Sequence, residues 1–194
     1  GINTRMIYLL YDDGSRSEKV ILNELGGCKG IIQSDGYSPY RKLESDAYPH
    51  ITRIPCLQHI KRKFIDCGED EPDAKRIVEL INTLYQNEHK HKIGVDGWTV
   101  EQNLVHRKKY APDILGEIKD VLDDIEERGD LLPKSELKEA VTYLRNEWNA
   151  VVDIFNYGDT YLDNNIVERM NRYISLSRKN SLFFGSHKGA ERGA

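Results

Sequence analysis

Two acidic residues are the strongest candidates for chemistry in this sequence. Asp35 follows Lys29–Ser34, a run typical of a strand, and α/β proteins place ligand and metal groups at strand ends. Glu168 follows Asp163–Asn165, a cluster typical of a helix start, and helical geometry puts it on a polar face with Arg172. Asp-Gly is also a common turn, and Glu with Arg four residues later is a common exposed pair. Position alone leaves both interpretations open.

Cysteine and histidine form a second candidate group. Cys56 and His59 have the spacing C-x2-H, and Cys67 follows, so a zinc site is one interpretation, although only three ligands are in view. The other is a buried thiol near a helix start. Three cysteines without C-x2-C spacing favour reduced thiols in a cytoplasmic setting.

The end of the chain is basic and lies next to aromatic residues. A loop at Leu182–Ser186 (LFFGS) accompanies these basic residues, and such a combination suits either phosphate binding or a solvated tail. The basic residues from Glu168 onward are Arg169, Arg172, Arg178, Lys179, Lys188 and Arg192.

The elements that must position these residues begin with an α/β segment. Apolar and β-branched runs predict strands at Met6–Tyr11, Lys29–Ser34 and Ile51–Pro55. A helix capped by Ser15 or Ser17 is expected between the first two strands, ending at Gly26-Gly27. The order strand, helix, strand favours a parallel or mixed sheet.

From Cys56 onward the apolar spacing becomes helical. The α/β fold is therefore expected to be interrupted by a mainly α-helical insertion, with residues 1–55 as the first part of the core, 56–157 as helical linker and insertion, and 158–194 as the C-terminal core helix and basic tail. The expected helices in the insertion start at Cys56 and Pro72 and cover Trp98–Tyr110, Pro112–Arg128 and about Lys134–Phe155, the last ended by Gly158.

Composition limits the class of protein. The 194 residues carry 28 basic and 32 acidic side chains, so the formal net charge is 28 − 32 = −4, which excludes a wholly basic nucleic-acid coat protein. No apolar run approaches the roughly 20 residues that span a bilayer, so no membrane partner is expected. The average hides a separation, because acids gather in 113–127 while basic residues gather in Arg53–Lys63 and from Arg169 onward.

Three blocks in order resemble the insertion sequence 66 family of transposases. They are Q-x-DGY-x2-Y at Gln33–Tyr40, C-x2-H-x2-RKF at Cys56–Phe64, and DNN-x2-ER at Asp163–Arg169. The last block continues as RKN-x2-F-x-GS and a G-x-E-R tail. Two positions depart from the family pattern, because Leu57 and Ser181 replace the usual aromatic residues.

The resemblance implies an RNase H-like core with a D-D-E acidic triad that binds two divalent ions, Mg²⁺ or Mn²⁺. Asp35 would be the second acid and Glu168 the third, and both would be metal ligands. Asn164 and Asn165 would support the helix that carries Glu168. The residues expected to contact DNA are Arg172, Arg178 and Lys179, followed by His59, Arg62 and Lys63.

The implied reaction is cleavage at transposon-end DNA followed by attack of the freed 3′-hydroxyl on target DNA, with a homo-oligomer as a further expectation. The family places its first acid on an earlier strand than Met6–Tyr11, so the chain is interpreted as a fragment that lacks this acid and is inactive alone. The alternatives are a non-catalytic DNA-binding or interaction remnant, and a small metal-dependent nuclease.

Overall fold

The computed structural model describes residues 17–169, 172 and 188. The chain forms two compact units, which are described separately. The terminal unit comprises Gly1–Gly30, Ser38–Ile51 and Asn165–Ala194, and the helical unit comprises Ile31–Tyr37 and Thr52–Asn164. The predicted strand Met6–Tyr11 lies outside the described residues.

The terminal unit contains α1 (Glu18–Leu25) and the 3₁₀-helix η1 (Ser38–Glu44), which pack against each other. The helix α1 starts after Ser17, as predicted, and ends at Gly26. A Cβ atom at Gly26 would lie 2.7 Å from the Tyr48 ring, so glycine is needed here for close packing.

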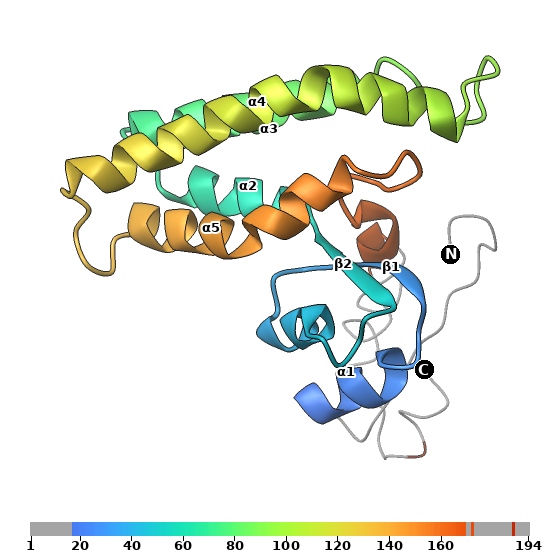
Figure 1. Ribbon diagram of the computed structural model, residues 1–194. Helices are drawn as coiled ribbons and strands as arrows, with labels where there is room; N and C mark the ends of the chain where they lie inside the picture. Colours follow the sequence, from blue (N-terminus) through green and yellow to red (C-terminus); the bar gives the residue numbers. More distant parts are fainter. Residues whose placement is uncertain (1–16, 170–171, 173–187, 189–194) are drawn as a thin grey trace. The chain divides into compact units, whose positions relative to one another are not determined.

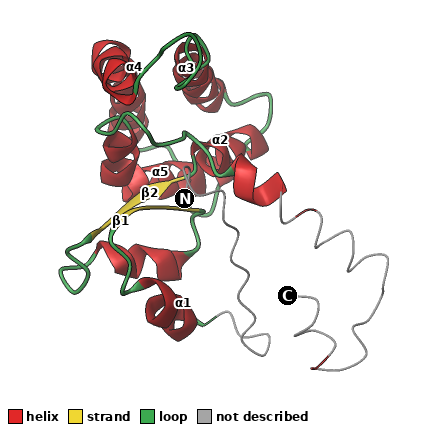
Figure 2. Ribbon diagram, turned by 90° about the vertical axis from the view of Figure 1, so that its right-hand side faces the viewer, coloured by secondary structure: helices red, strands yellow, loops and turns green. Residues whose placement is uncertain are grey.

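Two neighbouring strands form a small parallel sheet, β1 (Gly30–Ser34) and β2 (Ile51–Pro55). Their parallel register follows from two hydrogen bonds, Gly30 N to the carbonyl of His50 at 2.8 Å and Cys56 N to the carbonyl of Ser34 at 3.1 Å. Figure 2 shows the two strands side by side. The mixed α/β class was therefore predicted correctly, whereas the strand–helix–strand argument for a parallel or mixed sheet concerned Met6–Tyr11, which lies outside the described residues.

Four helices build the helical unit: α2 (Leu57–Asp66), α3 (Pro72–Glu88), α4 (Val100–Arg128) and α5 (Glu136–Ile154). The contacts run from α4 to α3, from α3 to α2 and from α2 to α5, and Figure 1 shows α3 alongside α4. Apolar residues at steps of three or four supply the core, including Ile60, Ile77, Leu84, Ile118 and Leu144.

The helix α4 corrects one expectation. Separate helices were predicted on either side of Pro112, but α4 runs without a break over 29 residues. A proline inside a helix removes only one N–H donor and crowds one carbonyl, here that of Lys108. Burial of Ala111 and Ile114 on the same face, against the rest of the core, keeps the two halves in line.

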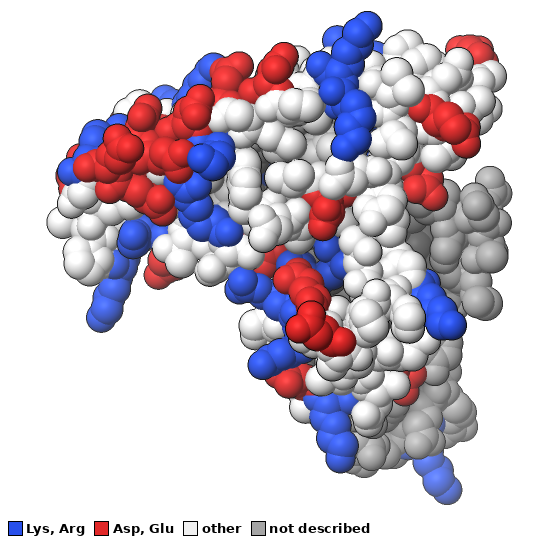
Figure 3. Space-filling model, viewed as in Figure 1, with Lys and Arg blue, Asp and Glu red and all other residues white. Residues whose placement is uncertain are grey.

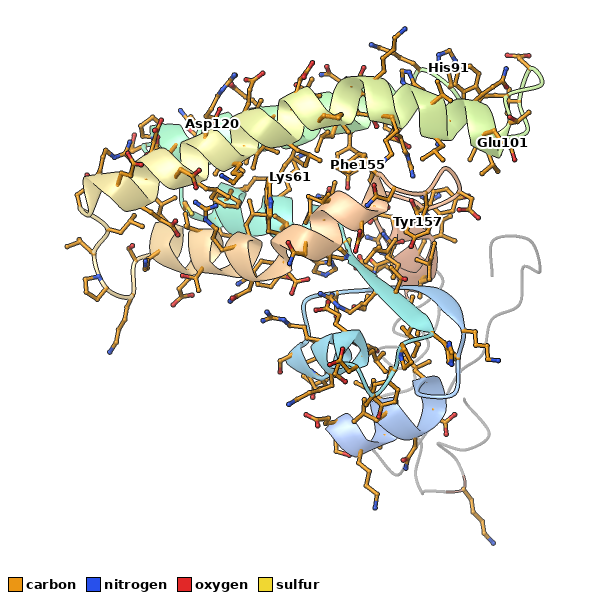
Figure 4. All side chains as sticks on the ribbon, viewed as in Figure 1. Lys61, His91, Glu101, Asp120, Phe155 and Tyr157 are labelled. Carbon is orange, nitrogen blue, oxygen red and sulfur yellow. The ribbon has the colours of Figure 1, made fainter. Side chains whose placement is uncertain are left out.

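Both ends of α4 are well defined. Thr99 and Gln102 form a capping box, in which Gln102 N donates to Thr99 Oγ1 at 3.2 Å and Thr99 N donates to Gln102 Oε1 at 2.9 Å. The other end stops at Gly129, whose φ of 64° is in the left-handed region. Figure 4 places Glu101 and Asp120 far apart along this helix.

Acidic side chains gather over the C-terminal half of α4, as Figure 3 shows. Several of them are engaged within the unit. Glu117 Oε2 lies 2.6 Å from Arg76 of α3, and Arg145 of α5 binds both Asp123 and Glu126 of α4. The acidic stretch therefore helps to hold neighbouring helices, in addition to facing solvent.

Among the described residues, no helix is both long enough and apolar enough to cross a membrane.

Candidate active site

Asp35 lies on a turn directly after β1. Its Oδ1 accepts a hydrogen bond from Tyr37 N at 3.2 Å, which is the geometry of an Asx turn. The side chain is half-buried, and within the described part of the chain it forms no ion pair. The strand β1 is therefore followed directly by the Asp35 carboxylate, at the position where the sequence led us to expect it.

A chain of buried polar contacts, called the relay below, supports this turn. Ser34 Oγ donates to the carbonyl of Asp35 at 3.0 Å and accepts from Arg53 Nη1 at 3.3 Å. The other terminal nitrogen of Arg53 forms an ion pair with Glu147 Oε2. Both side chains of this pair are fully buried, so the pair links β2 to α5 inside the protein.

Tyr143, one turn before Glu147 on α5, packs directly against the same turn. A Cβ atom at Gly36 would lie 1.7 Å from the Tyr143 hydroxyl oxygen, so only glycine fits next to Asp35. Burial raises the pKa of Tyr143 to about 12, and the nearby carboxylates of Glu147 and Asp35 add to this shift. The hydroxyl is therefore neutral near pH 7.

Gln33 joins the turn region to a distant segment. Its Nε2 donates to the carbonyl of Tyr161 at 2.8 Å and to that of Pro55 at 3.3 Å. Close by, Leu57 N donates to the carbonyl of Leu162 at 2.8 Å. The segment that leads into Asp163-Asn164-Asn165 is thus fixed to the sheet that carries Asp35.

The cysteine and histidine group does not converge on one ion. Cys56 precedes the ten-residue helix α2 and Cys67 follows it, so the helix separates them by about 15 Å. Burial raises the pKa of the Cys56 thiol, while hydrogen bonds from the backbone amides of Asn164, His59 and Gln58 lower it. The interpretation as a buried thiol at a helix start describes Cys56, and Cys67 Sγ donates to the carbonyl of Lys63.

Glu168 lies in the terminal unit, on a helical stretch at 165–169, and its side chain is exposed. Asn164 directly precedes this stretch, and its buried Oδ1 accepts no hydrogen bond within the described residues. Arg172 is exposed. Arg178 and Lys179 lie outside the part of the chain that the structure describes.

Basic residues of α2 lie near the turn that carries Asp35. Lys63 Nζ is 5.5 Å from the centre of the Tyr143 ring, which itself packs against Gly36. Arg62 is exposed, and His59 is half-buried. The helix therefore brings at least one cation to the neighbourhood of the carboxylate through Tyr143.

The carboxylate donors suit a divalent ion in part. Hard oxygen ligands are the kind that Mg²⁺ and Mn²⁺ prefer, and among the described residues the Asp35 carboxylate accepts one hydrogen bond, which leaves oxygen lone pairs for a ligand. Within the described ranges, however, no three His, Cys, Asp or Glu side chains gather as a metal-binding group. Asp35 is thus a suitable single ligand.

Sequence reasoning missed Arg53, Tyr143 and Glu147. One signal was present for Glu147, because it falls on the apolar stripe of α5, three residues after Leu144, where a charge requires a buried partner. Nothing in the local sequence identified that partner as Arg53, which is 94 residues away.

Comparisons with known proteins support one assignment. Residues 2–192 match the family described as Transposase IS66 family. The uncharacterized protein y4jD of Sinorhizobium fredii is 30% identical over 91% of this chain and 35% of its own length. The uncharacterized protein y4hP of the same organism is 27% identical over 96% of this chain and 36% of its own length. The chain thus spans about a third of the length of these relatives, and no solved structure matches it. Because the family match covers nearly the whole sequence, the chain belongs to the IS66 family of transposases.

Proposed function

We propose that this chain is part of the catalytic region of a DDE-type transposase with an RNase H-like core. The reaction is hydrolysis of a phosphodiester bond at a transposon end, followed by attack of the freed 3′-hydroxyl on a phosphodiester bond of target DNA. The observation that carries the proposal is the family match over residues 2–192, together with the Asp35 carboxylate on the turn after β1.

Asp35 and Glu168 are the proposed catalytic carboxylates. Transposases of this type typically use divalent metals, and Mg²⁺ or Mn²⁺, as two ions in the complete enzyme, suits the donors of both residues. When bound, such ions stabilise negative charge on the reacting phosphate oxygens. The chain's own contribution is to hold the Asp35 oxygens in place, which the turn and its buried support do.

The proposed DNA contacts are cationic. Lys63 and Arg62 would neutralise phosphates near Asp35, with His59 on the same helix as a further contact. Arg172, Arg178 and Lys179 would do so after Glu168, and Asn164 with Asn165 would support the start of that helix. A homo-oligomer acting on paired DNA ends remains part of this proposal.

Binding of Mn²⁺ to the 194-residue chain tests the carboxylate roles. Paramagnetic broadening of amide resonances is expected at Tyr37 and near Glu168, and we expect Asp35→Asn and Glu168→Gln each to weaken it. Asp66→Asn and Glu24→Gln are matched controls, because each changes an exposed acid of the same type in the same unit. Equal broadening in all five proteins would contradict the proposal.

Binding of duplex DNA tests the second part. Arg62→Gln with Lys63→Gln is expected to weaken binding and to reduce the salt dependence, because fewer phosphates are neutralised. Lys75→Gln with Lys138→Gln removes the same charge from exposed positions elsewhere in the unit. If the chain binds DNA while Asp35→Asn and Glu168→Gln leave Mn²⁺ binding unchanged, the non-catalytic DNA-binding alternative is favoured.

A further inference from the structure

The geometry points to a positioning device behind Asp35, formed by Arg53, Glu147, Tyr143 and Ser34. Three elements that are distant in sequence meet here: the end of β1, the strand β2 and the helix α5. We assign to these residues the task of fixing the direction of the Asp35 carboxylate. Their role in catalysis rests on the function proposed above, whereas their effect on the turn does not.

The first contact is the polar relay. Arg53 uses one terminal nitrogen for Glu147 and the other for Ser34 Oγ. Because the Ser34 oxygen accepts from Arg53, its own proton is directed to the carbonyl of Asp35. Glu147 thus fixes the arginine, the arginine fixes the hydroxyl, and the hydroxyl fixes the peptide group of Asp35.

An apolar pair could fill the same space. Replacing a buried ion pair by packed apolar side chains is often neutral or stabilising, so stability alone does not require Arg53 and Glu147. Apolar side chains could not orient the Ser34 hydroxyl. The polar pair therefore supplies direction, which a carboxylate that must bind a ligand at defined angles needs.

The second contact is steric and comes from the same helix. Tyr143 and Glu147 are four residues apart on α5, so they lie on one face. Tyr143 leaves no room for a side chain at position 36, which closes one side of the turn. Together the two contacts restrict the turn, one at the carbonyl of Asp35 and the other at Gly36. Neither contact involves the Asp35 carboxylate, which therefore keeps its oxygens for other partners.

Hydrogen exchange at the Tyr37 amide reports on this device without any catalysis, because this amide donates to Asp35 Oδ1. Ser34→Ala removes the relay and leaves the ion pair in place. We expect exchange at Tyr37 to become roughly tenfold faster, the effect of losing one hydrogen bond. Thr83→Ala is the matched control, since it removes a hydroxyl-to-carbonyl bond of 2.9 Å within α3. Unchanged exchange at Tyr37 in Ser34→Ala would overturn the proposal.

Mn²⁺ titration of the same proteins connects the device to the site. Ser34→Ala is expected to weaken Mn²⁺ binding severalfold at unchanged thermal stability relative to Thr83→Ala, and Asp35→Asn to abolish it at this position. Faster Tyr37 exchange with full Mn²⁺ affinity would overturn the link to the site. If Asp35→Asn binds Mn²⁺ normally while Ser34→Ala still loosens Tyr37, the proposed metal role of Asp35 fails and the positioning of the turn stands.

Discussion

Two buried arginines hold turns in the helical unit, and they differ in what they hold. Arg53 lies behind the turn of Asp35, and Arg107 of α4 lies behind the segment that follows α5. Each pairs with one glutamate, Glu147 for Arg53 and Glu88 for Arg107. By burial and by charge pairing, the two look like equivalent core ion pairs.

Arg107 is surrounded by acceptors. It binds both oxygens of Glu88 at 2.7 Å and donates to the carbonyls of Ile154, Tyr157 and Thr160 at 3.2, 2.5 and 2.7 Å. Figure 4 shows Tyr157 just beyond the end of α5. Arg107 supplies hydrogen bonds to backbone carbonyls of a segment that has no regular secondary structure, so its role is structural.

Arg53 donates one terminal nitrogen to Glu147 and the other to the Ser34 hydroxyl, which in turn donates to the carbonyl of Asp35. Its contact with Ser34 does not hold a loop directly. The contact sets the direction of the Asp35 peptide group, which lies next to the Asp35 carboxylate. The difference teaches that burial and pairing do not separate a supporting arginine from a positioning one. The two roles differ instead in the groups that accept the remaining hydrogen bonds, which are mainly backbone carbonyls for Arg107 and a side-chain hydroxyl for Arg53.

The largest effect is expected at Arg107. Arg107→Met should lower the free energy of unfolding by about 3–5 kcal/mol, because Glu88 and three carbonyls lose their donor. The double variant Arg107→Met/Glu88→Leu should recover little, since the carbonyls remain unsatisfied. Urea denaturation measures both, and a double variant as stable as the wild type would remove the contrast with Arg53.

The matching change at Arg53 should behave differently. Arg53→Met alone should also cost about 3–5 kcal/mol, because the buried Glu147 carboxylate loses its ion-pair partner. The double variant Arg53→Met/Glu147→Leu should regain most of that stability and yet keep fast exchange at Tyr37. Recovery of both stability and slow Tyr37 exchange would show that Arg53 does not position the turn.

Gly36→Ala should destabilise the chain by about 1–3 kcal/mol, because its methyl group would overlap Tyr143. Combining it with Tyr143→Ala should give a smaller loss than the sum of the single variants. Gly116→Ala, in the exposed middle of α4 with nothing within 4 Å, is the control and should be neutral or stabilising. Additive losses would place Tyr143 away from the turn.

The smallest effect concerns alkaline pH. The pKa of Tyr143 is raised by burial from 10.0 to about 12, so its contribution to stability is complete below pH 10 and is lost as the pH rises toward 12. Burial also raises the pKa values of Tyr85 and Tyr110. Tyr143→Phe should therefore make the fall in stability between pH 10 and 12 shallower without removing it, as thermal unfolding would show.

Local patterns in the sequence predicted most elements of the fold. The strand at Ile51–Pro55 and the start of α3 at Pro72 were predicted as observed, because β-branched residues and a first-turn proline are local signals. Pro112 led to a wrong prediction of two separate helices, because core burial on both sides of it outweighs one missing hydrogen bond. The helix α5 was expected to run to about Phe155 and ends at Ile154, so Gly158 lies beyond its C-cap. The glycine serves close packing instead, because a Cβ there would lie 2.1 Å from the carbonyl of Val100.

The candidate site was predictable only in part. The place of Asp35 directly after β1 was predictable, because a strand followed by Asp-Gly is a local feature, whereas its role as a metal ligand stays a prediction from the family resemblance. The residues behind it were not found, since Ser34 meets Arg53 across 19 positions and Arg53 meets Glu147 across 94. A single sequence gives the chemistry of such residues without their pairing, whereas a charged residue on an apolar helix face shows that some partner must exist.

The hydrogen bond from Leu57 N to the carbonyl of Leu162 closes a long loop at its base. Loop closure becomes only about 0.6 kcal/mol less favourable for each doubling of length, so residues added at an exposed connection between these two residues weaken the closure only slightly. The segment from Tyr143 to Leu162 is an exception, because α5 contacts the turn of Asp35. We therefore expect insertions and deletions to be tolerated at the exposed connection between α3 and α4, and the spacing from Tyr143 to Leu162 to resist change.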